Sequence, residues 1–239
     1  YQEALALDEA GQLQGAIIEL KNAVLADPGH EEAVYTLGRL HLVQGDVQSA
    51  IKEFERIRDL RSRDPGLLQK LARAHMEAGS LDAASAVLEE IPPRARDAQF
   101  FALRGLALLR QGKEDAAEAD LAAALERDSG NVLAHKGRAL LALGRRDVED
   151  ARGLLREALT ATGRHPEIQV RLGELLLREG RFEDALPLFI EALEAMHYQG
   201  SQLAWAAHVG AAKAYLGQRA LEAAEGELAR LAEINRNHS

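Results

Sequence analysis

Apolar residues recur along the chain with the spacing of one face of an α-helix. A small residue stands at seven places, a bulky apolar residue follows four positions later, and a further apolar or small residue follows three positions after that. This i, i+4, i+7 spacing places all three side chains on one helical stripe. The small residues are Ala16, Ala50, Ala84, Ala117, Ala151, Ala185 and Ala224, and the bulky residues are Leu20, Phe54, Leu88, Leu121, Leu155, Phe189 and Leu228.

A second series of residues precedes each of these helices. Glycines that could close a tight turn recur at intervals of 32 to 37 residues, and another small residue lies seven positions before each of them. The pattern predicts a repeated unit of two antiparallel helices joined by a glycine turn. A single pair cannot bury its own apolar face, so the units are expected to stack and share a core. The glycines are Gly11, Gly45, Gly79, Gly112, Gly144, Gly180 and Gly217.

The repeats divide the whole chain into one array. In the fifth and seventh units the gap from the turn glycine to the small residue is seven rather than five, and about three extra residues precede the seventh unit, around Met196–Gln202. The first helix is expected to be truncated and the chain to be part of a longer protein. The predicted units are approximately 1–30, 31–64, 65–97, 98–131, 132–165, 166–199 and 200–239.

Residues 31–64, EEAVYTLGRLHLVQGDVQSAIKEFERIRDLRSRD, resemble the tetratricopeptide repeat consensus. The resemblance extends over essentially the whole chain, and it implies an all-α, right-handed solenoid of about seven helix-turn-helix repeats, or about fourteen helices. Residues 16–46 resemble the repeats of bacterial lipoproteins linked to exosortase and exopolysaccharide systems, which implies a bacterial origin. The consensus positions present in residues 31–64 are Leu37, Gly38, Gly45, Asp46, Ala50, Phe54 and Ile57.

Composition narrows the possible partners and compartments. The formal net charge of −9 argues against general affinity for nucleic acid, whose phosphates attract clustered Lys and Arg. The sequence has no cysteine, so it has no disulfide and no thiolate metal site. No apolar stretch approaches the roughly 20 residues that cross a bilayer, so direct membrane insertion is not expected. A cytoplasmic or a periplasmic protein fits these observations equally.

The sequence carries no recognisable catalytic or cofactor-binding motif. It lacks the glycine-rich loops that hold nucleotides, the HExxH metal motif and the GxSxG nucleophile motif. His41 and His75 occupy the same position in adjacent units, where the family places a packed aromatic residue, so we interpret them as core residues. The sequence therefore predicts no enzyme, no cofactor and no metal site.

The resemblance implies a binding surface on the concave side of the array, lined by the first helix of each unit at positions 2, 5, 9, 12 and 13. Arginine is frequent there, and its planar fork of donors suits carboxylates. The hypothesis is a groove that binds an acidic segment of a partner protein beside apolar anchors. The candidate groove residues are Arg39, Arg73, Arg110, Arg138, Arg178, Tyr35, Leu42, Met76 and Leu109.

Tyr198 and Trp205 form a second candidate interface, because aromatic residues are favoured as interface anchors. Trp205 also stands beside the consensus aromatic position of a repeat, which favours a packing role for it, so Tyr198 is the freer of the two. Three functions remain open. The chain could be a scaffold or adaptor that binds a peptide or protein segment in its concave groove. It could be a periplasmic accessory module in bacterial cell-surface polysaccharide export or secretion, or a scaffold that forms homo-oligomers through uncapped end repeats.

Overall fold

The computed structural model describes residues 1–58, 64–198 and 201–236, and within these ranges the chain contains fourteen α-helices and no strand. The predicted all-α solenoid of helix pairs is confirmed. The helices are α1 (Gln2–Glu9), α2 (Leu13–Ala26), α3 (Glu31–Gln44), α4 (Val47–Arg58), α5 (Pro65–Glu77), α6 (Leu81–Glu89), α7 (Ala98–Arg110), α8 (Glu114–Arg127), α9 (Val132–Gly144), α10 (Val148–Ala161), α11 (Pro166–Arg178), α12 (Phe182–Ala195), α13 (Gln202–Gly217) and α14 (Leu221–Arg236), with a short 3-10 helix at Pro93–Ala95.

In the middle and later units, a bulky residue of a second helix packs between the small residues of two first helices. Leu121 on α8 contacts the positions of Gly105 on α7 and Gly137 on α9, where an added Cβ would lie 2.9 and 2.5 Å from its side chain. Phe189 on α12 fills the same place between Gly173 and Gly210. The small residues therefore let one large side chain join its own unit to the next.

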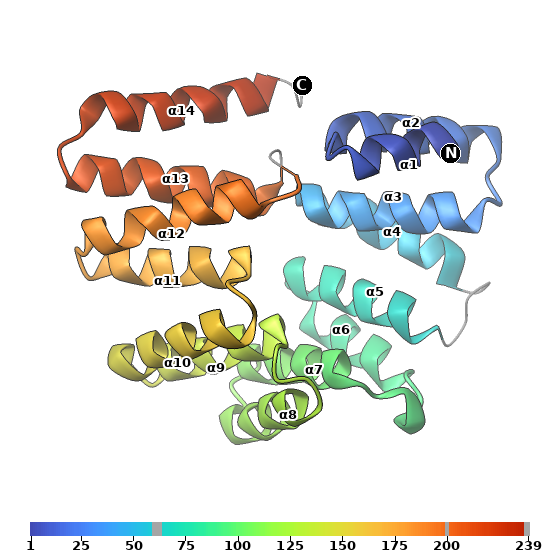
Figure 1. Cartoon of the computed structure of the whole chain (residues 1–239). Coiled ribbons are helices and arrows are strands. Elements are labelled where there is room, and N and C mark those ends of the chain that lie inside the picture. Colours follow the sequence, from blue (N-terminus) through green and yellow to red (C-terminus); the bar gives the residue numbers. More distant parts are fainter. Residues whose placement is uncertain (59–63, 199–200, 237–239) are drawn as a thin grey trace.

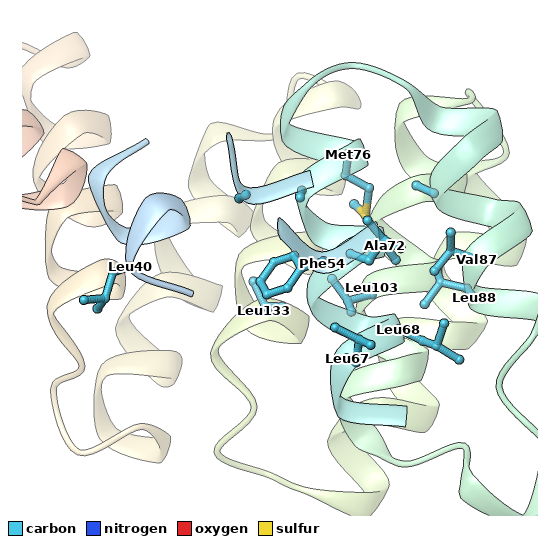
Figure 2. Packing of buried hydrophobic residues seen from close by; sticks show 14 of the residues in the cluster. Leu40, Phe54, Leu67, Leu68, Ala72, Met76, Val87, Leu88, Leu103 and Leu133 are labelled. Carbon is cyan, nitrogen blue, oxygen red and sulfur yellow. The ribbon is translucent and has the colours of Figure 1, made fainter. Parts of the chain in front are cut away.

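The apolar core follows the array through the described residues and is largest in its first half. Figure 2 shows the side chains of Phe54, Leu68, Leu88 and Leu103, which belong to one buried cluster that runs from α1 to the start of α9. A second buried cluster runs from the last turns of α9 to α13. The stacked pairs thus share a continuous interior within each cluster, as expected for repeats that cannot bury their faces alone.

The turns within the helix pairs correct one sequence prediction. The left-handed conformation falls on Gly11, Gly45, Gly79, Gly112 and Gly180 as predicted, but in the fifth and seventh units it falls on Arg146 and Arg219. Each arginine lies two residues after the predicted turn glycine and five before the buried alanine of the next helix. The turn therefore keeps a constant spacing to the core position, even though an L-residue adopts this conformation at a cost of roughly 1–2 kcal/mol.

Gly144 and Gly217 are instead the last residues of α9 and α13. Gly217 lies against the ring of Phe182, where any side chain would collide with it. This glycine is explained by close approach of two helices, and the turn itself begins after it.

The last helix also departs from the predicted register. Leu228 was expected in the core but is 51% exposed, whereas the neighbouring Glu227 is 4% exposed. Glu227 accepts a hydrogen bond from the ring of His208 on α13 at 2.6 Å and pairs with Arg230 at 2.7 Å. Only one stripe of α14 packs on α13, and its other face has no following helix among the described residues, so the wider apolar face of earlier units is not buried here.

The array curls round so that distant units meet (Figure 1). The segment between α12 and α13 lies beside α1 and α3, and α13 contacts α3 directly. His197 bonds through its ring Nε2 to the backbone oxygen of Asp8 at 2.7 Å, and Tyr198 donates to the Asp8 carboxylate. Gly11 makes this approach possible, since a Cβ there would lie 2.5 Å from the carbonyl oxygen of His197. The extra residues predicted around Met196–Gln202 therefore form the contact that closes the array on itself. Gln199 and Gly200 lie outside the described residues.

Candidate functional site

The concave side of the array holds a cavity of about 780 Å³, here called the central cavity. Its walls come from the first helices of successive units and from the segment that closes the array. The volume lies within the range of about 300–1,000 Å³ common for ligand-binding sites. Its lining residues are Leu42, Val43, Arg73, Glu77, Arg110, Lys136, His165, Pro166, Glu167, Arg171, Ala195, Met196, His197, Tyr198, Ser201, Gln202, Leu203, Trp205 and Ala206.

The face of each first helix that lines the cavity covers a smaller angle than the family positions 2, 5, 9, 12 and 13 suggested. Arg73 and Glu77 occupy positions 9 and 13 of the third unit and line the cavity, and Glu167 and Arg171 occupy positions 2 and 6 of the sixth. At 100° per residue these four positions fall within about 60° of one another. Positions 5 and 12 point roughly 80° away, towards the neighbouring helix, so most of their side chains are buried.

Met76, at position 12, is an example of a predicted groove residue that is buried. Its side chain is 4% exposed and lies among the buried residues labelled in Figure 2, so it is not available to a ligand. Its backbone carbonyl instead accepts a hydrogen bond from the guanidinium of Arg110. Met76 is therefore a buried residue that lines neither the central cavity nor the smaller pocket beside it, although Leu42 at the same position of the second unit lines both.

Charged side chains in the central cavity are held by specific partners. Lys136 on α9 and Glu167 on α11 form an ion pair at 2.6 Å, and Arg73 bonds to Glu77 at 2.8 Å. Burial raises the pKa of Glu167, but the attraction of Lys136, with further help from Arg73 and Arg171, lowers it overall. The Glu167 carboxylate therefore stays ionised inside a cationic wall.

A smaller pocket of about 370 Å³, here called the side pocket, adjoins the central cavity and shares Leu42, Val43 and Arg73 with it. Burial lowers the pKa of Lys70, and the nearby charges of Arg73 and Arg39 lower it further. The side pocket therefore concentrates positive charge around a half-buried lysine. Its lining is Tyr35, Arg39, Leu42, Val43, Gly66, Gln69, Lys70, Arg73 and Gln99.

The remaining groove residues predicted from sequence are distributed over several places. Arg73 and Arg110 line the central cavity, and Arg178 lines a third pocket of about 90 Å³ next to Lys136 and Arg171. Arg138 and Leu109 are half-buried and are not among the lining residues of the central cavity or the side pocket. Tyr35, Arg39 and Leu42 line the side pocket.

Tyr198 and Trp205 do not form a separate surface. Both line the central cavity together with Arg73 and Arg110. Trp205 is 46% exposed, so it is not part of the core. The Tyr198 hydroxyl donates to Asp8 and accepts from Arg39 at 3.4 Å, and burial together with the bond to Asp8 raises the pKa of Tyr198. The two residues predicted for a second interface therefore line the same cavity as two of the predicted groove arginines.

Sequence reasoning missed Lys70, Lys136 and Arg171, which contribute as much charge to the two pockets as the predicted arginines. Lys70 and Arg171 both stand at position 6 of their units, on the same stripe as positions 9 and 13. A helical projection of each unit would have found them. Asp8 and His197 carried no comparable signal, because the contact between them depends on the curvature of the whole array.

Two further features bear on chemistry and location. Within the residues that the structure describes, no group of three or more His, Asp or Glu side chains is placed to hold a metal ion. In the same part of the chain, no helix has both the length and the apolar surface needed to pass through a bilayer.

Comparison with family models gave matches over most of the chain. Two models, each described as a tetratricopeptide repeat, match residues 9–65, 43–107 and 142–204 in one case and residues 102–166 in the other. A search of curated proteins gave no match.

Solved structures share the fold at low sequence identity. A tetratricopeptide repeat protein from Parabacteroides merdae is 18% identical, with a TM-score of 0.59 over 98% of this chain and 91% of that one. MamA is 21% identical, with a TM-score of 0.52 over 66% of this chain and 93% of that one. The Cut9–Hcn1 hetero-tetramer of the APC/C contains a chain that is 15% identical, with a TM-score of 0.61 over 98% of this chain and 46% of that one.

Proposed function

This chain belongs to the tetratricopeptide repeat family, and from that premise we propose that its central cavity binds an acidic segment of a partner protein. Repeat arrays of this family are scaffolds for protein–protein interaction, and their extended concave surfaces serve that role. The proposal adds the chemistry of the partner to this general function.

The charge of the cavity wall carries the proposal. The chain as a whole has a formal net charge of −9, yet four basic residues line the central cavity against two acidic ones. A cavity lined by an excess of one charge concentrates ligands of the opposite charge. The basic residues are Arg73, Arg110, Lys136 and Arg171, and the acidic ones are Glu77 and Glu167.

Apolar side chains lie within the same wall. Leu42, Met196 and Trp205 line the cavity next to the cations. Trp205 is the large aromatic residue of these three, and it is more than one third exposed. Tryptophan and arginine are the residues most often responsible for binding energy at protein interfaces. The expected ligand is therefore a segment in which Asp or Glu alternates with bulky apolar residues.

A peptide-binding measurement tests this function. Fluorescently labelled ten-residue peptides with Glu beside Leu and Phe are compared with peptides in which every Glu is Gln. We expect the acidic peptides to bind and the amide peptides to bind at least tenfold more weakly, because a charge-assisted hydrogen bond contributes about 1.5–3 kcal/mol. The Arg110→Glu/Arg171→Glu variant should lose binding.

The control is Arg156→Glu, which makes the charge change of one of these two substitutions at an exposed position of α10 that does not line the cavity. Circular dichroism would establish that each variant keeps its helices. Equal affinity for acidic and amide peptides, or full binding by the double variant, would contradict the proposal.

Self-association is a second candidate, favoured by one observation. Leu221 and Leu228 on α14 are 62% and 51% exposed, and Leu216 on α13 is 51% exposed. Exposed apolar groups that form one contiguous patch are typical of contact surfaces. Sedimentation velocity over a hundredfold concentration range should show a dimer that the Leu221→Glu/Leu228→Glu variant abolishes. A monomer throughout that range would exclude this function.

A further inference from the structure

The side pocket differs from the central cavity in how its charges are compensated. Its lining contains Arg39, Lys70 and Arg73 but no acidic residue. In the central cavity, by contrast, Lys136 is neutralised within the wall by Glu167 at 2.6 Å. The side pocket therefore gathers three positive charges without an acid inside it.

Two of these cations reach an acidic partner beyond the pocket. Arg39 pairs with Asp8, and Arg73 pairs with Glu77 at 2.8 Å. Among the residues that the structure describes, Lys70 forms no ion pair and is half-buried. One positive charge in the pocket is thus left without compensation.

The environment of Lys70 is unfavourable for its own charge. Burial is the largest influence and lowers its pKa, and repulsion from Arg73 and Arg39 acts in the same direction. An anion bound among the three side chains would reverse both effects, since an opposite charge nearby favours the charged form. The pocket is therefore electrostatically incomplete without a ligand.

We propose that the side pocket is an anchoring subsite for a phosphoryl group, held by Arg39, Lys70 and Arg73. A phosphoryl group carries close to two negative charges on one compact set of oxygens, which matches three cations that line one pocket better than a single carboxylate does. Arginine guanidinium groups bind such oxygens in pairs, and lysine adds a point charge. The side-chain amide of Gln99 lines the same pocket and adds a hydrogen-bond donor, whereas that of Gln69 already donates to Asp97 at 2.8 Å.

This subsite rests on the proposed function, since it would hold one residue of the segment bound in the adjoining central cavity. Arg73 belongs to both cavities and therefore connects them. The same chemistry could come from a phosphorylated side chain of a partner or from a free phosphate compound. The experiment separates these sources.

The first arm observes Lys70 directly by NMR of isotopically labelled lysine side chains in a pH titration. Inorganic phosphate is added at about 50 mM, which detects binding with a dissociation constant in the millimolar range. It should raise the pKa of Lys70 and leave the NMR signals of the exposed Lys52 unchanged. Malonate and acetate at the same ionic strength should have smaller effects. An unchanged Lys70 pKa in phosphate, or a larger shift in malonate, would overturn the assignment to a phosphoryl group.

The second arm uses ten-residue acidic peptides that carry phosphoserine or serine at one position. Phosphoserine should strengthen binding, and Lys70→Gln should weaken binding of the phosphopeptide by about ten- to a hundredfold while changing that of the serine peptide less than threefold. Lys52→Gln on α4 is the control with the same loss of charge. Equal binding of both peptides would assign the site to free phosphate compounds if the NMR shift is present.

Failure of the subsite and failure of the proposed function are distinguishable. If acidic peptides bind and Lys70→Gln has no effect on any of them, the central cavity remains a peptide site and the phosphoryl subsite is wrong. If no peptide binds but phosphate raises the pKa of Lys70, the subsite stands and the proposed function is wrong.

Discussion

Successive units and the two meeting ends of the array are joined by different kinds of contact. Between α12 and α13, the fully buried ring of Phe189 occupies the space left by Gly173 and Gly210. Where the array meets itself, the end of the sixth unit contacts the first two units through Asp8, Arg39 and the two residues His197 and Tyr198. The first contact is apolar and dry, and the second is polar and half-exposed.

This difference implies a difference in strength. Burial of a large aromatic side chain stabilises a fold by several kcal/mol, and packing is insensitive to pH and salt. An ion pair whose arginine side chain is 33% exposed contributes about 1 kcal/mol or less, because solvent screens it. The helix pairs should therefore stay stacked under conditions in which the closing contact opens.

The largest expected effect comes from emptying an inter-unit contact. Phe189→Ala should lower the free energy of unfolding by about 3–5 kcal/mol, since it removes a side chain that is 0% exposed and leaves a cavity between two units. Urea denaturation followed by circular dichroism measures this change. Leu25→Ala, at a side chain that is 82% exposed, is the control and should change stability little. A loss below 1 kcal/mol in Phe189→Ala would show that the units do not depend on this contact.

Overfilling such a contact should have the next largest effect. Gly38→Ala places a Cβ 2.6 Å from the Phe54 ring and should cost about 1–3 kcal/mol, although alanine favours helices. Gly153→Ala in α10 meets no atom within 4 Å and should instead stabilise the protein by about 0.5–1 kcal/mol. The opposite signs are the test, and two stabilising substitutions would mean that α3 and α4 can separate without penalty.

Removing the contact that closes the array should change the shape of the array more than its free energy of unfolding. Asp8→Ala removes the acceptor shared by Arg39 and Tyr198 and should cost about 1 kcal/mol. Because the chain has no cysteine, spin labels can be introduced at Glu3→Cys and Lys213→Cys, and pulsed electron resonance measures their separation. We expect a broader distance distribution in Asp8→Ala and an unchanged one in Glu9→Ala. Identical distributions in all three proteins would mean that the curvature is set by the unit interfaces alone.

The smallest effect is an alkaline transition of the same contact. Burial and the bond to Asp8 raise the pKa of Tyr198 above its ordinary value of about 10. The folded state therefore holds this proton more tightly than the unfolded state, and the contribution of Tyr198 is complete below pH 10 and is lost as the pH rises through the folded pKa. The label distance should lengthen in that range, and Tyr198→Phe should lack the step. A step of equal size in Tyr198→Phe would assign it to another group.

The repeat pattern alone was sufficient to predict the helix pairs and the residues that join them. Alanine and glycine at fixed distances from Phe54, Leu121 and Phe189 required close helix packing, and the structure places these side chains together. Local spacing determines such contacts, because neighbouring units meet through the same few positions each time.

Predictions from sequence were wrong at positions where the local sequence pattern is compatible with two different structures. A glycine near the expected turn suggested Gly144 and Gly217, but the constant spacing of five residues to the buried alanine places the turns at Arg146 and Arg219. In α14, the burial of Glu227 depends on His208, a partner 19 residues away. The irregular gaps of seven residues were visible in the sequence and in fact marked the displaced turns.

The closing contact could not be inferred from any local pattern. His197 and Asp8 are 189 residues apart, and their meeting depends on small rotations summed over all the intervening units. The family positions predicted that arginines of the first helices line a groove. Which of these cations share one pocket depends on the same summed rotations between units.

The division of the apolar core at α9 has a consequence for cooperativity. Leu133 and Ala134, in the first turn of this helix, pack in the cluster that begins at α1, whereas Ala139 and Ala142 pack in the cluster that extends to α13. Proteins lose structure in units that share buried contacts, and amide hydrogens exchange in groups that reflect those units. The chain is therefore built as two folding blocks that have one helix in common, and α9 is the place where disorder in one block would stop or spread.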